Sequence, residues 1–204
     1  FSRYSRVRSM TGMTGAEAAR RLLNAQGIYD VTVQQIAGEL TDHYDPRTKT
    51  VNLSQSVYGA TSVAAIGVAA HECGHAMQDN EGYAPLRFRS ALVPVANFGS
   101  SLSWPLILLG LVFGGLGSPL VEIGILMFSL AVLFQLVTLP VEYNASARAV
   151  RLLDAQGILA GEEVNGTRKV LNAAALTYVA AAATSILQLL RLIILFGGRN
   201  RRDR

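Results

Sequence analysis

The sequence predicts a mainly α-helical membrane protein with a smaller, mixed α+β part at its N-terminal end. Half of the 204 residues are hydrophobic and only 16% are charged, whereas soluble domains average about 25% charged residues. The charge is also unevenly distributed, because residues 1–90 are mixed sequence while residues 91–141 and 173–198 contain almost no charged side chains. Long uncharged stretches beside an ordinary polar part are typical of a membrane protein that carries a polar domain.

The first element expected is a helix over residues 14–26. Thr14 stands at the N-cap position and Glu17 follows three residues later, which is the capping-box pattern. Gly27 comes directly after the last helical residue, where glycine commonly ends a helix. Both ends of this helix are therefore predicted from local sequence.

A β-structure and a second helix are expected next. Residues 31–54 alternate β-branched with polar residues on either side of the sequence DPRT, which predicts a β-hairpin or meander with a turn at the proline. Residues 61–80 predict a helix capped by Thr61 or Ser62 and rich in alanine and glycine, so that it can pack closely against its neighbours.

Three apolar segments follow that are long enough to span a bilayer: 91–116, 119–141 and 173–198. The connection GGLGSP between the first two is very short, so we expect an antiparallel hairpin with both outer ends on one side of the membrane. The predicted organisation is an N-terminal part with the site helix (1–90), a transmembrane hairpin (91–141), a polar helical return broken around GILAGEEVNG (142–172), and a C-terminal apolar helix with a basic tail (173–204).

The predicted helix over 61–80 carries the sequence AAHECGHAMQ, which contains the motif HExxH. Residues four apart share one face of a helix, so His71 and His75 can bind one metal ion, with Glu72 beside them to reach a water on that ion. Cys73 lies on the opposite face and is expected to be a small buried residue rather than a ligand. The motif predicts catalytic zinc, with structural zinc or a vestigial site as the alternative.

A catalytic zinc takes three protein ligands, and the third has four candidates in this chain: His43, Asp79, Glu81 and Glu142. Asp79 and Glu81 lie on the same helix a turn or more beyond His75, too far along it to complete a tetrahedron. His43, in the predicted hairpin, could approach the site. Glu142 is the first charged residue after the membrane hairpin, which returns it to the side from which the motif departs. A His, His, Glu set is favoured.

These features resemble known families. The motif, a two-helix membrane hairpin and then Glu142 resemble the HtpX-type membrane zinc proteases, which are gluzincins; more closely, TGAEAARRLL, DHYDPRTKTVNLS and AAHECGHAMQ are similar to the putative neutral zinc metallopeptidases of the YugP type, bacterial membrane proteins. The resemblance implies a zincin-like catalytic domain with zinc on His71, His75 and Glu142 and with Glu72 as acid/base. Ser146 stands where HtpX-type proteases tend to have aspartate, which leaves the role of that position open.

The chemistry implied is hydrolysis of peptide bonds by an endopeptidase. Zinc would lower the pKa of its water toward about 7 and polarise the scissile carbonyl, and Glu72 would take the water proton and deliver it to the leaving amine. Tyr143 and His43 are both candidates for stabilising the oxyanion. The strand TVNLS is the expected edge along which an extended substrate would pair. The substrate-binding residues expected on it are Val51, Asn52 and Leu53.

Basic residues cluster beside apolar stretches instead of forming one stripe, which favours lipid headgroups and excludes a nucleic-acid partner. Arginines flank the hairpin on both outer ends, whereas GGLGSP has no Lys or Arg, so the positive-inside rule predicts a cytoplasmic site in a bacterial inner membrane. A third full span would put the tail GRNRRDR outside, so residues 173–198 either span or lie in the interface.

The partners expected are the lipid bilayer and a peptide or protein substrate; a homo-oligomer or a membrane-protein partner stays open. Two other classes of function remain. One is a non-proteolytic membrane scaffold with structural zinc. The other is a transporter or channel subunit, which would explain the polar residues Gln135, Gln188 and Arg191 in apolar segments. The chain begins at Phe1 rather than Met, so residues before it are expected to be missing or removed; whether they include an upstream transmembrane helix stays open.

Overall fold

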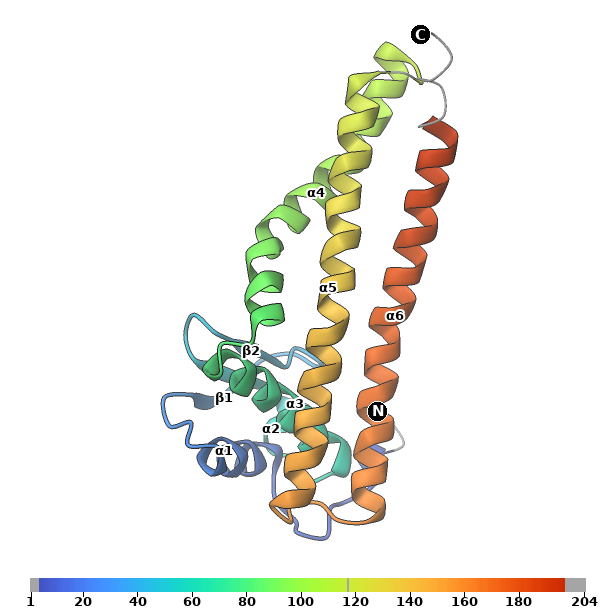
Figure 1. Ribbon diagram of the computed structural model, residues 1–204. Coiled ribbons are helices and arrows are strands. Elements are labelled where there is room, and N and C mark those ends of the chain that lie inside the picture. Colours follow the sequence, from blue (N-terminus) through green and yellow to red (C-terminus); the bar gives the residue numbers. More distant parts are fainter. Residues whose placement is uncertain (1–3, 117, 197–204) are drawn as a thin grey trace. The chain divides into compact units, whose positions relative to one another are not determined.

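The computed structural model describes residues 4–116 and 118–196. They are mainly helical with one small sheet, and they divide into two compact units: residues 4–86 with 141–176, and residues 87–116 and 118–140 with 177–196. The basic tail GRNRRDR lies outside the described residues. The elements after a short 3-10 turn at Tyr4–Arg6 are α1 (Gly15–Ala25), β1 (Thr32–Ile36), β2 (His43–Asp45), β3 (Thr50–Ser54), α2 (Gln55–Tyr58), α3 (Val63–Asn80), α4 (Ala84–Gly114), α5 (Pro119–Ala155) and α6 (Glu162–Phe196) (Figure 1).

In the first unit, α1 begins and ends where its local sequence predicts. The Thr14 side chain accepts a hydrogen bond from the Glu17 backbone N–H, and the Glu17 carboxylate accepts one from the Thr14 N–H, which completes the capping box. Gly27 follows with a φ of 69°, a left-handed conformation that glycine adopts without strain. The apolar face of α1, with Leu22 and Leu23, is fully buried and packs on α3.

The sheet has the strand order β1-β3-β2, with β1 parallel and β2 antiparallel to β3. The hairpin predicted around DPRT is therefore present as β2 and β3, but β1 adds in parallel, so the sheet is mixed. The expectation that TVNLS is a free edge is wrong. Val51 pairs with Val33 and Tyr44, and Asn52 also has a partner on each side, because β3 is the central strand. Leu53 pairs with β1 and is fully buried.

Helix α3 is capped by Ser62, whose hydroxyl accepts from the Ala65 N–H, as one of the two predicted caps. Two glycines seven residues apart, hence on one face, let other helices approach. A Cβ on Gly67 would lie 2.8 Å from the Thr167 side chain of α6, and a Cβ on Gly74 would lie 2.6 Å from the carbonyl oxygen of Ala145 on α5. This glycine face brings α3 close to both long helices.

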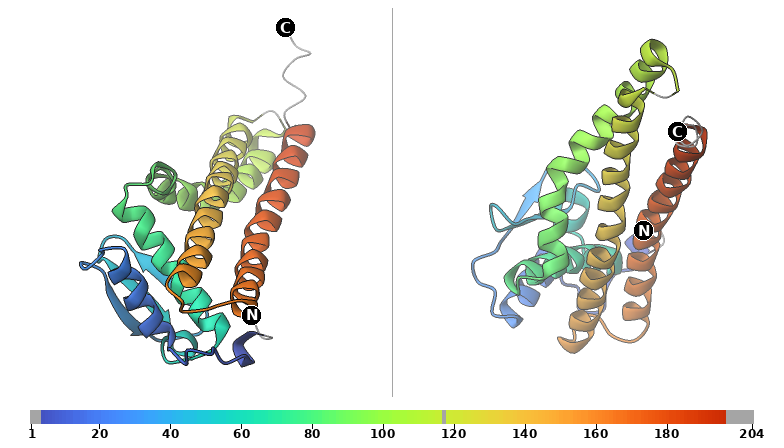
Figure 2. Two further views of the ribbon diagram at one scale, coloured as in Figure 1. Left: turned by 60° about the horizontal axis from the view of Figure 1, so that its bottom comes forward. Right: turned by 45° about the horizontal axis from the view of Figure 1, so that its top comes forward.

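Helices α5 and α6 are longer than the sequence predicts, and each is one uninterrupted helix in Figures 1 and 2. The prediction that a new helix begins at Glu142 is wrong, because α5 continues through Pro140 and carries Glu142 in its interior. Proline removes one intrahelical hydrogen bond, a loss that helices in membranes tolerate when neighbouring groups satisfy the freed carbonyl. The predicted break follows α5, where Gly157 and Gly161 have positive φ.

In the second unit, α4 and α5 form a closely packed pair. A Cβ on Gly99 would lie 2.6 Å from the Met127 carbonyl oxygen, and one on Gly124 would lie 2.9 Å from that of Ser103. Small residues that let backbones approach are typical of helix packing in membranes. Among the described residues, α4, α5 and α6 are long and apolar enough to cross a membrane. Large hydrophobic side chains such as Phe113 are exposed along them.

Candidate metal centre

Three side chains with metal-binding atoms meet in the first unit. Oε2 of Glu142 lies 3.1 Å from Nε2 of His71 and 3.6 Å from Nε2 of His75, and the ligand atoms of the three residues all lie within 4.8 Å of one another. A tetrahedral zinc site with metal–ligand bonds of about 2.0–2.1 Å separates its ligand atoms by roughly 3.4 Å. The two measured distances lie on either side of that value, so these donors fit a zinc ion.

Two helices deliver these ligands. His71 and His75 are one turn apart on α3, and their rings meet edge to face with centroids 4.8 Å apart. Glu142 comes from α5, seventy residues along the chain, and reaches the histidines because α5 crosses α3 in contact with Gly74. A side chain at position 74 would push Ala145, and with it Glu142, away. The glycine inside the motif therefore makes room for the third ligand.

The site is largely closed to solvent. Glu142 is 3% exposed, and His75 and Glu72 are each 8% exposed. A buried carboxylate needs charged or hydrogen-bonding partners, and the two imidazoles supply them. Burial lowers the pKa of His75, but its contact with Glu142, the negative charges of Glu72 and Glu142 and its contact with Gln78 together raise it by more, so that pKa lies above its usual value.

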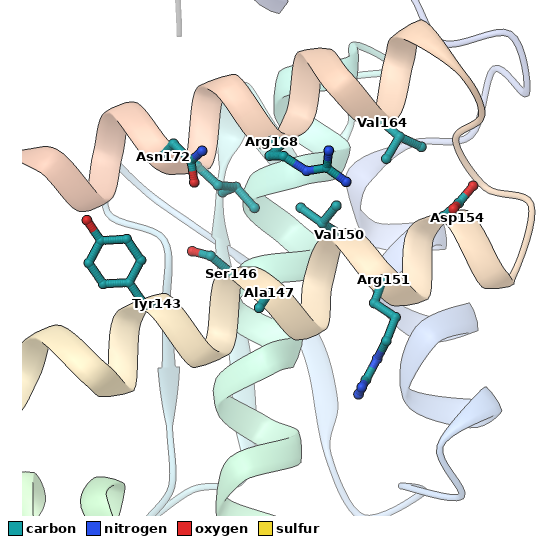
Figure 3. A pocket seen from close by; sticks show the side chains of 10 residues that line it. Tyr143, Ser146, Ala147, Val150, Arg151, Asp154, Val164, Arg168 and Asn172 are labelled. Carbon is teal, nitrogen blue, oxygen red and sulfur yellow. The ribbon is translucent and has the colours of Figure 1, made fainter.

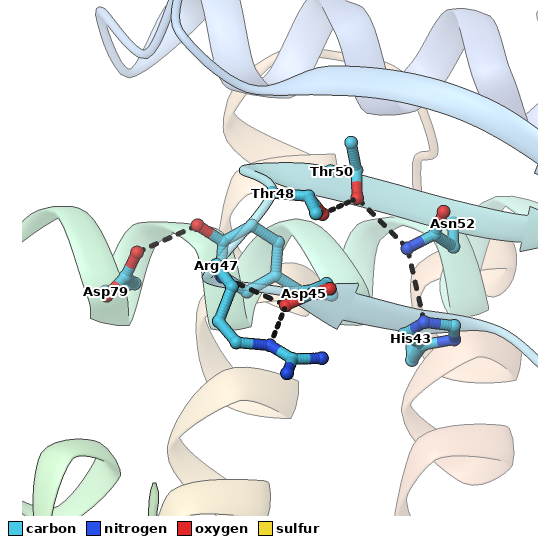
Figure 4. A network of polar contacts seen from close by, with 8 residues as sticks. His43, Asp45, Arg47, Thr48, Thr50, Asn52 and Asp79 are labelled. Carbon is cyan, nitrogen blue, oxygen red and sulfur yellow. Dashed lines mark hydrogen bonds and ion pairs between the residues drawn. The ribbon is translucent and has the colours of Figure 1, made fainter.

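The other three candidates for the third ligand have different partners. Nδ1 of His43 lies 2.8 Å from the Thr41 carbonyl oxygen, and its Nε2 lies 3.2 Å from the Asn52 amide nitrogen on the sheet (Figure 4). Asp79 accepts hydrogen bonds from the Tyr44 hydroxyl and from Lys49 Nζ at 2.8 and 2.9 Å. The third, Glu81, is bound by Arg148 at 2.6 Å. None of the three belongs to the group of metal-binding atoms.

Two polar side chains contact the Nδ1 atoms of the histidines, the ring nitrogens that do not face Glu142. Ser146 Oγ lies 3.1 Å from Nδ1 of His71, so the position left open by the sequence has a contact with a ligand. Gln78 Oε1 lies 3.0 Å from Nδ1 of His75. Sequence reasoning missed Gln78, although it stands three residues after His75 and therefore on the same face of the helix. Cys73 is buried on the opposite face with its Sγ 3.6 Å from the Ala19 carbonyl oxygen, as predicted.

A pocket of about 460 Å³ adjoins the centre. It lies between α5 and α6 within the first unit, and Ser146 belongs both to its wall and to the contact with His71. Figure 3 shows the Arg168 guanidinium, the Asn172 amide and the Tyr143 ring directed into this space from the two helices. The remaining lining residues are Ala147, Val150, Arg151, Asp154, Val164 and Leu171. The pocket therefore has polar and apolar walls, and Ser146 alone separates it from His71 in this chain of contacts.

Comparison with known proteins identifies the family of this chain. The family model described as "Putative neutral zinc metallopeptidase" matches residues 1–197. The "Putative membrane protease YugP" of Bacillus subtilis (strain 168) is 50% identical over 196 residues, which cover 96% of this chain and 86% of that protein. No solved structure matches. Together with the apolar helices, the relative's name supports membrane association. The chain belongs to the family of putative neutral zinc metallopeptidases.

Proposed function

We propose that this protein is a membrane-embedded, zinc-dependent endopeptidase that hydrolyses peptide bonds in membrane or membrane-proximal proteins. The observation that carries the proposal is the meeting of His71, His75 and Glu142 within 4.8 Å, next to the glutamate of the motif. Two histidines and one glutamate leave a fourth position of a tetrahedral ion open, which is the arrangement of catalytic rather than structural zinc. Family membership supports the same chemistry.

Each residue of the centre has a role in this proposal. When bound by His71, His75 and Glu142, zinc supplies a Lewis acid that polarises the scissile carbonyl and lowers the pKa of water. The Glu72 carboxylate takes the proton of the attacking water and donates it to the leaving amine. Glu72 is buried, so few solvent molecules compete with the attacking water for its carboxylate.

The substrate is proposed to lie along β2 and to place a side chain in the pocket. With β3 paired on both sides, an extended peptide could join the sheet only at an outer strand. We favour β2 because its Tyr44 hydroxyl binds Asp79 on α3, which holds that strand beside the helix of the metal ligands. The pocket next to Ser146 offers the Arg168 guanidinium to an acidic substrate side chain.

The proposed location is a bacterial inner membrane crossed more than once, with the metal centre on the cytoplasmic side. Arg87 and Arg89 precede the apolar part of α4, and Arg148 and Arg151 follow that of α5, while the α4–α5 connection contains no Lys or Arg. This distribution supports a cytoplasmic position for the first unit by the positive-inside rule.

The proposal is tested by zinc analysis and proteolysis of a membrane substrate, comparing wild type with Glu72→Gln. We expect the variant to keep zinc and lose cleavage, because the three ligands remain while the proton acceptor is gone. The matched control is Glu39→Gln, the same substitution at an exposed loop position, which should cleave normally. Cleavage that survives Glu72→Gln would rule out the mechanism, and a wild type without zinc would rule out the site. A scaffold with structural zinc would keep binding its partner in both variants.

A further inference from the structure

Gln78 is a fully buried polar side chain on α3, with 0% of its surface exposed. Its amide oxygen lies 3.0 Å from Nδ1 of His75. Its amide nitrogen donates two hydrogen bonds to α5, to the carbonyl oxygen of Val141 and to Oδ1 of Asn144, both at 2.9 Å. One side chain thus contacts a metal ligand and holds the helix of another.

The partners decide which end of this amide faces the histidine. The Val141 carbonyl oxygen can only accept. Oδ1 of Asn144 also acts as an acceptor, because Nε–H of Arg148 donates to it at 2.7 Å and a guanidinium has no acceptor. Both positions require the NH₂ end of Gln78. An amide whose orientation would otherwise be ambiguous is therefore oriented by an acceptor-only and a donor-only group.

The orientation of the Gln78 amide determines which ring nitrogen of His75 carries the proton. The amide oxygen can only accept, and it lies 3.0 Å from Nδ1 of His75. The carboxylate oxygen of Glu142 also only accepts, but it lies 3.6 Å from Nε2, beyond hydrogen-bond distance. Nδ1 therefore carries the proton of the neutral ring, and Nε2 keeps the lone pair on the side of Glu142. The other histidine is not constrained in this way. The Ser146 hydroxyl beside Nδ1 of His71 can donate or accept, so it permits either tautomer.

We propose that Gln78 is a positioning residue of the metal centre that selects the Nδ1–H tautomer of His75 and ties α5 to α3. The bond to the Val141 carbonyl acts one residue before Glu142, so the amide that orients one ligand also holds the backbone of another. At the far end, Nη1 of Arg148 donates to Glu81 at 2.6 Å, which anchors the chain of bonds at the surface.

The first test measures zinc affinity of the full chain in detergent micelles, by competition with a chelator. Gln78→Met keeps the volume and removes all three contacts, so zinc affinity should fall about 10- to 100-fold, the usual cost of removing a partner of a ligand histidine. The control Gln26→Met makes the same change at an exposed position after α1 and should bind zinc normally. Unchanged affinity in a folded Gln78→Met protein would overturn the inference.

Asn144 supplies a conservative pair for the same measurement. Asn144→Asp keeps an oxygen that accepts from both Gln78 and Arg148, so zinc affinity should stay near the wild-type value. Asn144→Leu removes that acceptor and frees the Gln78 amide to turn, so affinity should fall. Equal affinities in these two variants would contradict the orienting role, because Asp and Leu have similar shapes and differ chiefly in the oxygen acceptor that Gln78 needs.

A second measurement is made on the wild-type protein, and a variant serves only to assign one set of signals. The chain has three histidines, so ¹⁵N-histidine labelling gives three pairs of ring-nitrogen signals, and the pair of His75 is identified by its loss in His75→Gln. In metal-free wild type at alkaline pH, where the rings are neutral, we expect His75 as the Nδ1–H tautomer. A dominant Nε2–H form would overturn the inference.

The inference rests on the proposed zinc site, yet the two can fail separately. Wild type that binds no zinc would remove the proposed function, while the tautomer measurement would still test the role of Gln78. Conversely, a peptidase that is active and binds zinc equally well with and without Gln78 would refute the inference alone.

Discussion

The backbone of α3 at Gly74 touches the backbone of α5 at Ala145. A Cβ on Gly74 would lie 2.6 Å from the Ala145 carbonyl oxygen and 3.0 Å from its Cα. Real Cβ atoms do not approach backbone so closely, and a backbone carbonyl has no flexible end that could move aside. Gly74 lies between the two ligand histidines in the sequence, and Ala145 lies three residues after Glu142. It therefore sets the distance between the helices that form the metal centre.

Gly74→Ala should weaken zinc binding, because the added methyl group displaces α5 and moves Glu142 away from the histidines. Overpacking of this kind costs about 1–3 kcal/mol of stability. The measurement is chelator competition together with thermal unfolding of the metal-free protein. Gly59→Ala is the control, since a Cβ there meets nothing within 4 Å and φ is −96°. A Gly74→Ala protein with normal zinc affinity would contradict the close-contact argument.

Glu142→Ala should lower zinc affinity by more than about 100-fold, because loss of a ligand must exceed the loss of a ligand's partner, which costs about 10- to 100-fold. His43→Ala should leave zinc affinity unchanged, since its ring binds Thr41 and Asn52 rather than the metal group. It should cost the sheet roughly 0.5–1.5 kcal/mol through lost hydrogen bonds. Zinc loss in His43→Ala with retention in Glu142→Ala would reverse the assignment of the third ligand.

Cys73 should resist alkylation in the folded protein. Burial raises the pKa of its thiol, with a smaller contribution from the Glu72 charge. A raised pKa means that the thiolate, which is the reactive form, is absent at neutral and mildly alkaline pH. Because the chain has one cysteine, mass spectrometry after maleimide treatment reports this site alone. Rapid labelling before unfolding, at a rate equal to that after unfolding in detergent, would show that the thiol is exposed.

Arg168→Gln should raise KM for peptides with an acidic side chain near the cleaved bond, roughly fivefold, which corresponds to about 1 kcal/mol for an exposed charge pair. Zinc affinity should not change, because Arg168 lines the pocket and touches no ligand of the metal group. Lys169→Gln is the matched control, as it removes the same charge from the next position of α6 without lining the pocket. Equal KM values for the two variants would leave the pocket without a role in substrate charge selection.

The proposed orientation predicts different labelling of two engineered cysteines in intact cells. In a Cys73→Ala background, Leu116→Cys in the α4–α5 connection should react with a membrane-impermeant maleimide. Glu39→Cys, in an exposed loop of the first unit, should react only after the cells are broken. The opposite pattern would place the metal centre outside the cytoplasm and would contradict the positive-inside argument.

Local patterns predicted much of this protein. The capping box at Thr14 and Glu17, the Ser62 cap, the pairing of His71 with His75 and the apolar segments all depend on residues within a few positions of one another. Hydrogen bonds at helix ends and the period of the helix act over that same range. Such features are readable in a single chain without knowledge of its neighbours.

The order of the strands in the sheet could not be predicted from such local patterns. TVNLS has the alternation of any strand, and nothing in its five residues distinguishes a central strand from an edge. Its place between β1 and β2 depends on which segments pair with it, namely Thr32–Ile36 in parallel and His43–Asp45 in antiparallel. Only the pairing therefore showed that an added peptide strand must use another part of the sheet.

The sequence by itself determined the helix that carries the HExxH motif, the candidate glutamate beyond the hairpin and the segments that are long and apolar enough to cross a membrane. The tertiary structure decided which of four candidates lies beside the histidines, and it added Gln78 and Ser146 as their partners. The reason is physical: a ligand set requires atoms about 3–4 Å apart. That proximity arises where α5 crosses α3 at Gly74, which contacts Ala145, 71 positions later in the chain.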